Sequence, residues 1–215
     1  LQSKLVLTVS AVLVAFPTLF FFFFEFTDGT VGQRLLDAFF QTVTPRTAGF
    51  NTVDLAAMQG ASRAIMVVLM LIGGASGSTA GGMKMNTVGV LFANVGAIFR
   101  RRNEVEAFGR RIDPATVRQA AVIVTMYLTL FIGGGVALRA IEGLPLGSCL
   151  YESASAVATV GLTLGITPSL GVASQLILTV QMYLGRVGGL TLIYAALANP
   201  DTTPSRLPQE KVSVG

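Results

Sequence analysis

The sequence predicts an all-α membrane protein in which two units with the same order of segments follow each other along the chain. Only 12% of the 215 residues are charged and 52% are apolar, whereas soluble chains carry about 25% charged residues. Several uncharged stretches are long enough, at about 1.5 Å rise per residue, to cross a hydrocarbon core of roughly 30 Å. The third observation is a repeat, because the second half of the chain matches the first when shifted by 112 residues.

The composition excludes several classes of protein. The chain has no histidine and a single cysteine, Cys149, so it lacks the residues for Ser-His or Cys-His catalysis, a disulfide framework or a cysteine-rich metal site. Lys and Arg number 15 against 11 Asp and Glu, for a net charge of +4, but six of the arginines fall within residues 100–118. Loops on the inner side of a membrane are enriched in Lys and Arg. This clustering favours a topology signal over nucleic-acid binding.

The first unit contains one clear span and one that glycines interrupt. Residues 5–24 are uncharged and predict a span, whereas residues 31–58 are too polar for one and predict a short helix and a loop. Residues 64–83 are uncharged but hold five glycines, each costing about 1 kcal/mol relative to alanine in a helix. We therefore expect the helix to break over residues 73–82 and to resume over residues 85–99. Non-helical backbone at membrane depth lines a cavity or is buried in protein.

The second unit follows the same plan after a basic linker. Residues 119–138 predict a span, in which three consecutive glycines favour helix packing or a kink. Residues 153–185 are uncharged over 33 positions, too many for one helix, and glycines with Pro168 divide them into a short helix, a loop and a new span that continues to about residue 199. The predicted divisions are residues 1–99 for the first unit, 100–118 for a cytoplasmic linker, 119–200 for the second unit and 201–215 for a cytoplasmic tail.

The repeat places two short motifs at equivalent positions. Residues 47–49 (Thr-Ala-Gly) align without a gap on residues 159–161 (Thr-Val-Gly), and 10 of the 33 positions from 47–79 are identical to those from 159–191. About two or three identities are expected by chance in so biased a composition. Both units are predicted to enter from the cytoplasm and so to be parallel repeats. A short helix that dips into the membrane and returns as an extended Thr-x-Gly strand points carbonyls at the axis, where they can replace the water around a dehydrated cation.

Four sequence motifs, in order, resemble the Trk/Ktr/HKT superfamily of potassium transporters. They are TPRTAGFN at 44–51, GGASGSTAGGMK at 73–84, SASAVATVGL at 153–162 and GRVGGLTL at 185–192. The linker most resembles a Ktr-type membrane subunit. Members of this family have four membrane-pore-membrane repeats, and this chain matches the third and fourth. The resemblance therefore implies the C-terminal half of a pore, in agreement with Leu1 in place of an initiator Met, which predicts a fragment of a larger protein.

The resemblance implies potassium uptake across the bacterial plasma (inner) membrane by a multi-pass protein whose linker and C-terminus are cytoplasmic. It implies K⁺ as the transported ion, Na⁺ as a stimulating ion and no tightly bound cofactor. The implied partners are the missing N-terminal repeats, a second copy in a homodimer and a cytosolic nucleotide-binding regulatory ring. By analogy, the carbonyls of two quadrants of a potassium filter come from Thr47, Ala48, Gly49 and Phe50 and from Thr159, Val160, Gly161 and Leu162.

The resemblance also implies an intramembrane gate below the filter and an arginine that faces the permeation path. The implied gate residues are Gly74, Ser76, Gly77, Ser78, Thr79, Gly81, Gly82, Lys84 and Arg186. Pure helix packing is the alternative for the glycines, since Gly73, Gly77 and Gly81 satisfy the small-residue contact pattern. A charge near the bilayer centre costs roughly 2.5 to 3.5 kcal/mol on insertion scales. The alternative for Arg186 is therefore an internal ion pair or a set of carbonyl acceptors that holds helices together.

Other charged residues have structural interpretations. We place Glu152 at the start of the second short helix, where it stabilises the positive helix end or forms a hydrogen bond in the core without touching an ion. Arg46 is interpreted as an anchor for the first loop, and the linker as a solvated topology determinant, with docking of the regulatory ring as the alternative. The runner-up function is a half-size pore subunit or membrane scaffold that conducts only after assembly. An intramembrane enzyme ranks third, because the chain lacks a catalytic polar constellation.

Overall fold

The first unit forms four helices in a row. The computed structural model describes residues 1–102 and 104–187, and in it α1 (Gln2–Phe20) continues into the π-helix η1 (Phe21–Glu25). Thr30 then caps α2 (Val31–Val43), because its hydroxyl oxygen accepts a hydrogen bond from the Gln33 N–H at 3.3 Å. Two further helices complete the unit: α3 (Gly60–Leu71) and α4 (Met85–Phe99). The break between α3 and α4 covers the glycines at which the sequence predicts one.

The second unit follows a short hairpin, in which β1 (Glu106–Ala107) pairs antiparallel with β2 (Arg110–Arg111). The long helix α5 (Pro114–Glu142) begins at Pro114 rather than at Gln119, since the Asp113 carboxylate accepts from the Ala115 N–H and proline suits the first helical position. Residues 114–118 of the expected linker are therefore helical. The chain then forms α6 (Leu146–Val157), the 3₁₀ turn η2 (Thr167–Ser169) and α7 (Val172–Val187). The expected continuation of this last span to residue 199, and the tail, lie outside the described residues.

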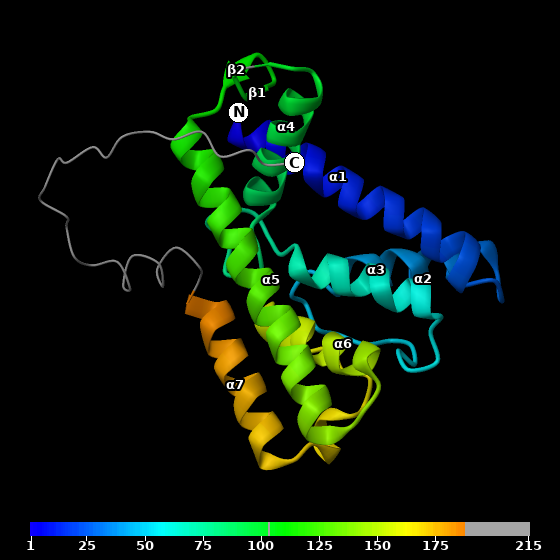
Figure 1. Ribbon diagram of the computed structural model, residues 1–215. Helices are drawn as coiled ribbons and strands as arrows, with labels where there is room; N and C mark the ends of the chain where they lie inside the picture. The colour runs from blue at the N-terminus through cyan, green and yellow to red at the C-terminus, as the bar shows by residue number, and fades with distance from the viewer. Residues whose placement is uncertain (103, 188–215) are drawn as a thin grey trace, which may run out of the picture.

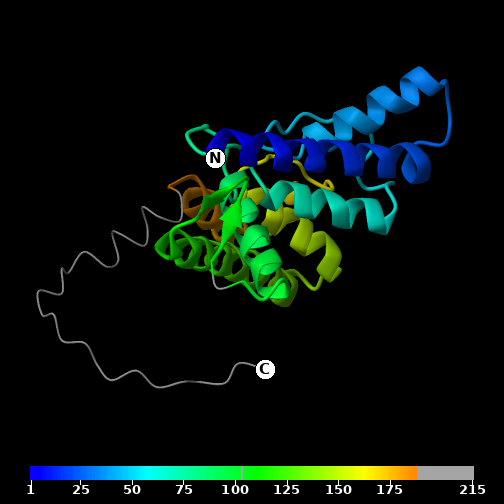
Figure 2. The ribbon, with the colours of Figure 1, turned by 90° about the horizontal axis from the view of Figure 1, so that it is seen from above.

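The short helix of each unit enters the fold and its loop leads back to the same end. In Figure 1, α6 rises from the lower end of α5 toward the middle of the molecule, and the yellow segment after it returns to the bottom, where α7 begins. The chain behaves alike in the first unit, where α2 points inward and the loop after it returns to the outer end of α3. Viewed from above in Figure 2, the two units lie beside each other. Packing of α3 on α6 and of α4 on α5 joins them.

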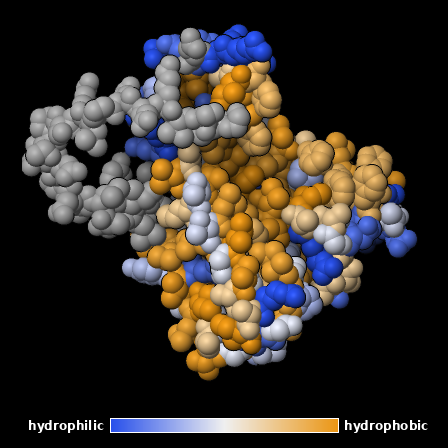
Figure 3. Space-filling model, in the orientation of Figure 1, coloured by the Kyte–Doolittle hydropathy of each residue, from blue (hydrophilic) through white to orange (hydrophobic). Residues whose placement is uncertain are grey.

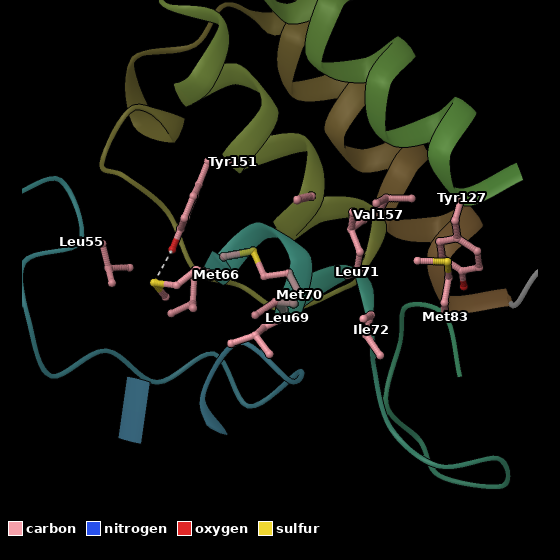
Figure 4. Close-up of a cluster of buried hydrophobic side chains, with 14 of the residues drawn as sticks. Leu55, Met66, Leu69, Met70, Leu71, Ile72, Met83, Tyr127, Tyr151 and Val157 are labelled. Atoms are coloured by element: carbon pink, nitrogen blue, oxygen red, sulfur yellow. Dashed lines mark hydrogen bonds between the residues drawn. The ribbon is translucent and has the colours of Figure 1, made fainter. Parts of the chain in front are cut away.

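Large apolar side chains from α3 and α6 fill the space between the units. Met66 and Met70 of α3 and Val157 of α6 are fully buried, and the hydroxyl of Tyr151 points at the Met66 sulfur at 3.8 Å (Figure 4). Methionine fills irregular gaps well because its side chain is unbranched and flexible. This contact packs α3 of the first unit against α6 of the second.

The outer surface is apolar where the long helices are exposed. Within the described residues, two helical segments, Gln2–Glu25 and Pro114–Glu142, are long and apolar enough to cross a membrane. Phe16 and Phe92 are 64% and 72% exposed. Figure 3 shows apolar surface over the middle of the molecule and hydrophilic residues at the top, around the β1–β2 hairpin. This distribution is typical of a chain that sits in lipid with a polar connection at one side.

Candidate functional site

The first Thr-x-Gly loop directly follows α2 and has an unusual backbone. Thr47 and Gly49 have φ angles of +65° and +76°, and Ala48 between them does not have positive φ. Thr44 holds this loop twice: its carbonyl accepts from the N–H groups of Ala48 and Gly49 at 3.2 and 3.1 Å, and its hydroxyl donates to the Phe50 carbonyl at 2.5 Å. Left-handed backbone at a threonine is uncommon and needs such support.

The second Thr-x-Gly loop has the same pattern of backbone angles. Thr159 and Gly161 have φ angles of +54° and +94°, and Val160 does not have positive φ. Ser155 holds the loop in this conformation, because its carbonyl accepts from the Val160 N–H at 2.9 Å and its hydroxyl accepts from the Gly161 N–H at 3.2 Å. The sequence reasoning singled out neither Ser155 nor Thr44 as a loop brace.

A buried carboxylate holds residues 163–167, which follow the second Thr-x-Gly motif and are called its outward limb. Glu152 is only 4% exposed, and it lies well inside α6 rather than at the start of that helix, because Pro145 allows the helix to begin at Leu146. Its oxygens accept from the Thr163 hydroxyl at 2.6 Å, the Leu164 N–H at 2.9 Å and the Thr167 hydroxyl at 2.6 Å. Glu152 therefore forms hydrogen bonds in the core, one of its two expected roles, and it does so with the loop itself.

The two loops meet backbone to backbone. A methyl group at Gly49 would lie 2.2 Å from the Val160 carbonyl oxygen, so the loops approach as closely as glycine allows. Beside the second loop, a cavity of about 390 Å³ is lined by Glu152, Gly161 and neighbouring residues. The structure thus brings Gly49 of the first predicted filter segment against Val160 of the second, 111 positions further along the chain.

The glycine-rich segment between α3 and α4 is a closed loop against the second Thr-x-Gly loop. Its ends are tied by hydrogen bonds from the Gly73 N–H to the Met83 carbonyl at 2.8 Å and from the Met83 N–H to the Leu71 carbonyl at 2.9 Å. Gly81 is buried where it passes Thr159, since a methyl group there would lie 2.1 Å from the Thr159 hydroxyl oxygen. This loop therefore touches the predicted filter at Thr159.

Two cations hold the exposed part of this loop through its carbonyls. The Lys84 ammonium donates to the carbonyls of Ser78 at 3.2 Å and Ala80 at 2.5 Å, and the Arg186 guanidinium of α7 donates to the Thr79 carbonyl at 2.5 Å. Three consecutive carbonyls are thus bound by cations from two different segments. Arg186 donates to a backbone carbonyl, in line with one of its two interpretations, and that carbonyl belongs to the predicted gate.

The remaining predicted residues lie as follows. Ser76 accepts from the Asn86 side-chain amide at 3.0 Å, which fastens the loop to the start of α4. Arg46 extends from the first loop to the Met85 sulfur at 3.1 Å, so it contacts the start of α4. Among the α5 glycines, Gly134 faces Gln181 of α7 and Gly135 faces Leu150 of α6. These two glycines serve close helix packing, and α5 continues through them as one helix.

Comparison with known proteins gives consistent matches along the chain. The family model described as a cation transport protein, TrkH, matches residues 1–204. The potassium/sodium uptake protein NtpJ of Enterococcus hirae is 37% identical over 226 residues, which cover 100% of this chain and 50% of that protein. The Ktr system potassium uptake protein B of Bacillus subtilis is also 37% identical, over 100% of this chain and 49% of its own length. The chain therefore spans about half the length of these curated relatives.

A solved structure has the same fold. The crystal structure of the potassium transporter TrkH from Vibrio parahaemolyticus superposes with a TM-score of 0.73 at 22% identity, and the match covers 93% of this chain and 44% of that one. The resemblance found in the sequence is confirmed by the family model and by these relatives. This chain is a membrane protein that belongs to the TrkH family of cation transport proteins.

Proposed function

We propose that the complete protein takes up potassium ions across the bacterial plasma membrane through a filter of backbone carbonyls. The observation that carries this proposal is the pair of Thr-x-Gly loops, which share alternating φ signs and meet at Gly49 and Val160. Alternating right- and left-handed backbone aligns successive N–H groups on one side of a chain and the carbonyls on the other. A row of carbonyls of this kind can replace the hydration shell of a potassium ion. The names of the relatives, which are potassium or potassium/sodium uptake proteins, support the same ion class.

The two units described here form half of that pore in our proposal. Each is a membrane-pore-membrane repeat, they are parallel, and they correspond to the third and fourth of four. Residues 1–99 and 119–200 are the repeats, residues 100–118 the cytoplasmic linker and residues 201–215 a cytoplasmic tail. The length of the relatives, about twice that of this chain, supports the presence of two further repeats. A homodimer, Na⁺ stimulation and control by a cytosolic nucleotide-binding ring complete the proposal and rest on the family resemblance.

The loop from Gly74 to Lys84 acts as the gate in this proposal, and Arg186 holds it closed. The loop lies against Thr159 of the second Thr-x-Gly loop through Gly81, and Arg186 binds the Thr79 carbonyl of the gate loop. A guanidinium stays protonated in proteins, so its charge also repels a cation that passes close by. Closure therefore combines a physical obstruction with an electrostatic barrier.

Growth rescue tests the transport function. The complete protein, expressed in a bacterium that lacks potassium uptake, should restore growth at low potassium, and Gly49→Ser and Gly161→Ser should reduce the K⁺/Na⁺ permeability ratio. Gly96→Ser is the matched control, because an added methyl group at Gly96 meets open space. A well-expressed complete protein that gives no rescue would contradict potassium uptake. An unchanged permeability ratio in both loop variants would contradict a filter at these loops.

Flux measurements test the gate separately. Deleting residues 77–80 removes the Thr79 carbonyl to which Arg186 donates, so the deletion and Arg186→Ala should each raise the maximal K⁺ uptake rate per folded molecule and leave the K⁺/Na⁺ ratio unchanged. Arg186→Lys keeps the charge and a donor, and should remain close to the parent rate. A rate that stays flat or falls in Arg186→Ala decides against the barrier. A changed ion preference in the deletion would place this loop in the filter or the fold instead.

A further inference from the structure

In each unit, a glutamate at the end of the long helix binds the start of the helix that follows the pore loop. Glu25, the last residue of η1, accepts from the Gln59 N–H at 3.2 Å and from the Ser62 hydroxyl at 2.5 Å. Glu142, the last residue of α5, accepts from the Gly171 N–H and from the Ser174 hydroxyl, at 2.9 and 2.5 Å. The two carboxylates thus make the same pair of hydrogen bonds.

The residues that donate these bonds occupy equivalent positions in the two repeats, whereas the two glutamates that accept them do not. Ser62 and Ser174 are an identical pair at the 112-residue shift, and Gln59 and Gly171 are paired by the same shift. Glu25 and Glu142 are 117 positions apart, so aligning the sequence with a single shift does not pair them. The structure pairs them nonetheless, because Glu25 lies 22 positions before Thr47, whereas Glu142 lies 17 positions before Thr159.

The bonds from the two serines are strong constraints on the fold because the serine hydroxyls are buried. The side chains of Ser62 and Ser174 are 1% and 0% exposed, and the glutamates are partly buried. A buried hydroxyl that loses its acceptor destabilises the folded state, because nothing then compensates for its lost contact with water. A carboxylate satisfies an N–H and a hydroxyl together with charge-assisted bonds, which are roughly twice as strong as neutral ones. Each glutamate therefore holds two segments that are far apart in the sequence at a fixed separation.

These bonds join the two ends of each segment that carries a Thr-x-Gly loop. The first such segment, residues 26–58, contains α2 and the first loop, and the second, residues 143–170, contains α6 and the second loop. We propose that Glu25 and Glu142 are positioning residues for the ion pathway, which fix the base from which each filter loop extends. This inference rests on the proposed filter function. A site held to a fraction of an ångström needs such a supporting shell.

The test uses the complete protein in vesicles, with K⁺ and Na⁺ fluxes measured on the same preparations. Glu25→Gln and Glu142→Gln should each lower the K⁺/Na⁺ permeability ratio several-fold. The double variant should lower it further, since each glutamate supports a different loop. Glu104→Gln is the matched control, because Glu104 pairs with Arg111 in the exposed linker at 2.9 Å. Its ratio should equal that of the parent.

Serine variants keep the test decisive if a glutamine variant fails to fold. Ser62→Ala and Ser174→Ala each remove one donor and should lower the ratio to a smaller extent. In the Glu25→Gln background Ser62→Ala should add less than it does alone, because the two residues share one bond. If folded variants at both glutamates and both serines keep the parent's K⁺/Na⁺ permeability ratio, the positioning role is overturned. A parent protein that transports no K⁺ would instead overturn the proposed function, so the two failures are distinguishable.

Discussion

The two Thr-x-Gly loops share the same alternation of φ signs but have different supporting side chains. In the first loop the braces are neutral, with the Thr44 hydroxyl on the Phe50 carbonyl and the Gln41 amide 3.4 Å from the Thr52 hydroxyl. In the second loop a buried carboxylate, Glu152, accepts three hydrogen bonds. The residue at the position equivalent to Glu152 in the first unit is Phe40. The repeat therefore preserves the shape of the loop and not the chemistry that supports it.

The glycines of the two loops differ as well. Gly49 has positive φ and also faces the Val160 carbonyl, so both its backbone angle and its lack of a side chain are needed. Gly161 has positive φ, but a methyl group there meets no atom within 4 Å. Glycine is thus required at position 49 by both its positive φ and the close approach of the Val160 carbonyl, and at position 161 by its positive φ alone.

Alanine at these glycines gives the largest expected difference between the loops. Gly161→Ala should cost about 1–2 kcal/mol, the usual penalty of left-handed backbone for a residue with a side chain. Gly49→Ala adds an overlap with the Val160 carbonyl, at 2.2 Å from the new methyl group, and should reduce K⁺ uptake per folded molecule far more. Uptake and thermal unfolding in detergent measure both effects. Equal losses in the two variants would show that the contact between the loops does not govern transport.

Removing the buried carboxylate should have the next largest effect, and only in the second loop. Glu152→Ala removes the acceptor shared by the Leu164 N–H and the hydroxyls of Thr163 and Thr167, and hydrogen bonds to a charged group contribute about 1.5–3 kcal/mol. We expect a lower unfolding temperature and a lower K⁺/Na⁺ permeability ratio. Glu152→Gln keeps one acceptor oxygen and should lose less of both.

An exposed carboxylate provides the comparison for Glu152. Glu106 pairs with Arg102 at 2.9 Å, and both side chains are about half exposed; such surface pairs are worth about 0–1 kcal/mol. Glu106→Gln should therefore leave the unfolding temperature and the permeability ratio near the parent values. If Glu152→Ala matches Glu106→Gln in both measurements, the outward limb of the second loop holds its shape without the carboxylate.

The sequence was sufficient to predict the order of helices and the position of the broken segment. Both depend on local properties: uncharged length for the spans, and glycine density for the break between α3 and α4. Helix starts were predicted less well. Counting charges placed the start of α5 after Arg118, whereas the cap at Asp113 followed by Pro114 decides it. A reading that weighed capping residues above charge would have found this boundary.

Contacts between segments could not be predicted from one sequence. The repeat identifies Gly49 and Gly161 as equivalent, but it does not indicate that Gly49 touches the Val160 carbonyl or that Gly81 touches Thr159. The uncharged run that begins at residue 153 places Glu152 at the start of the helix, but a buried carboxylate is tolerated within α6 because donors from the loop satisfy it. Residues that brace a loop carry no periodic pattern of their own.

Thr44→Val should give the smallest effect among the substitutions in the two loops, and it tests the contrast between neutral and charged braces. The substitution removes the hydroxyl that donates to the Phe50 carbonyl and keeps the shape of a side chain that is 2% exposed. The backbone bonds from Ala48 and Gly49 to the Thr44 carbonyl remain. One neutral hydrogen bond contributes about 0.5–1.5 kcal/mol, so K⁺ affinity should weaken slightly while the maximal rate stays unchanged. Initial uptake rates over a range of K⁺ concentrations separate these quantities. A Thr44→Val variant that loses as much selectivity as Glu152→Ala would mean that a single hydroxyl supports the first loop as firmly as the carboxylate supports the second, and that the charge of the brace is irrelevant to its strength.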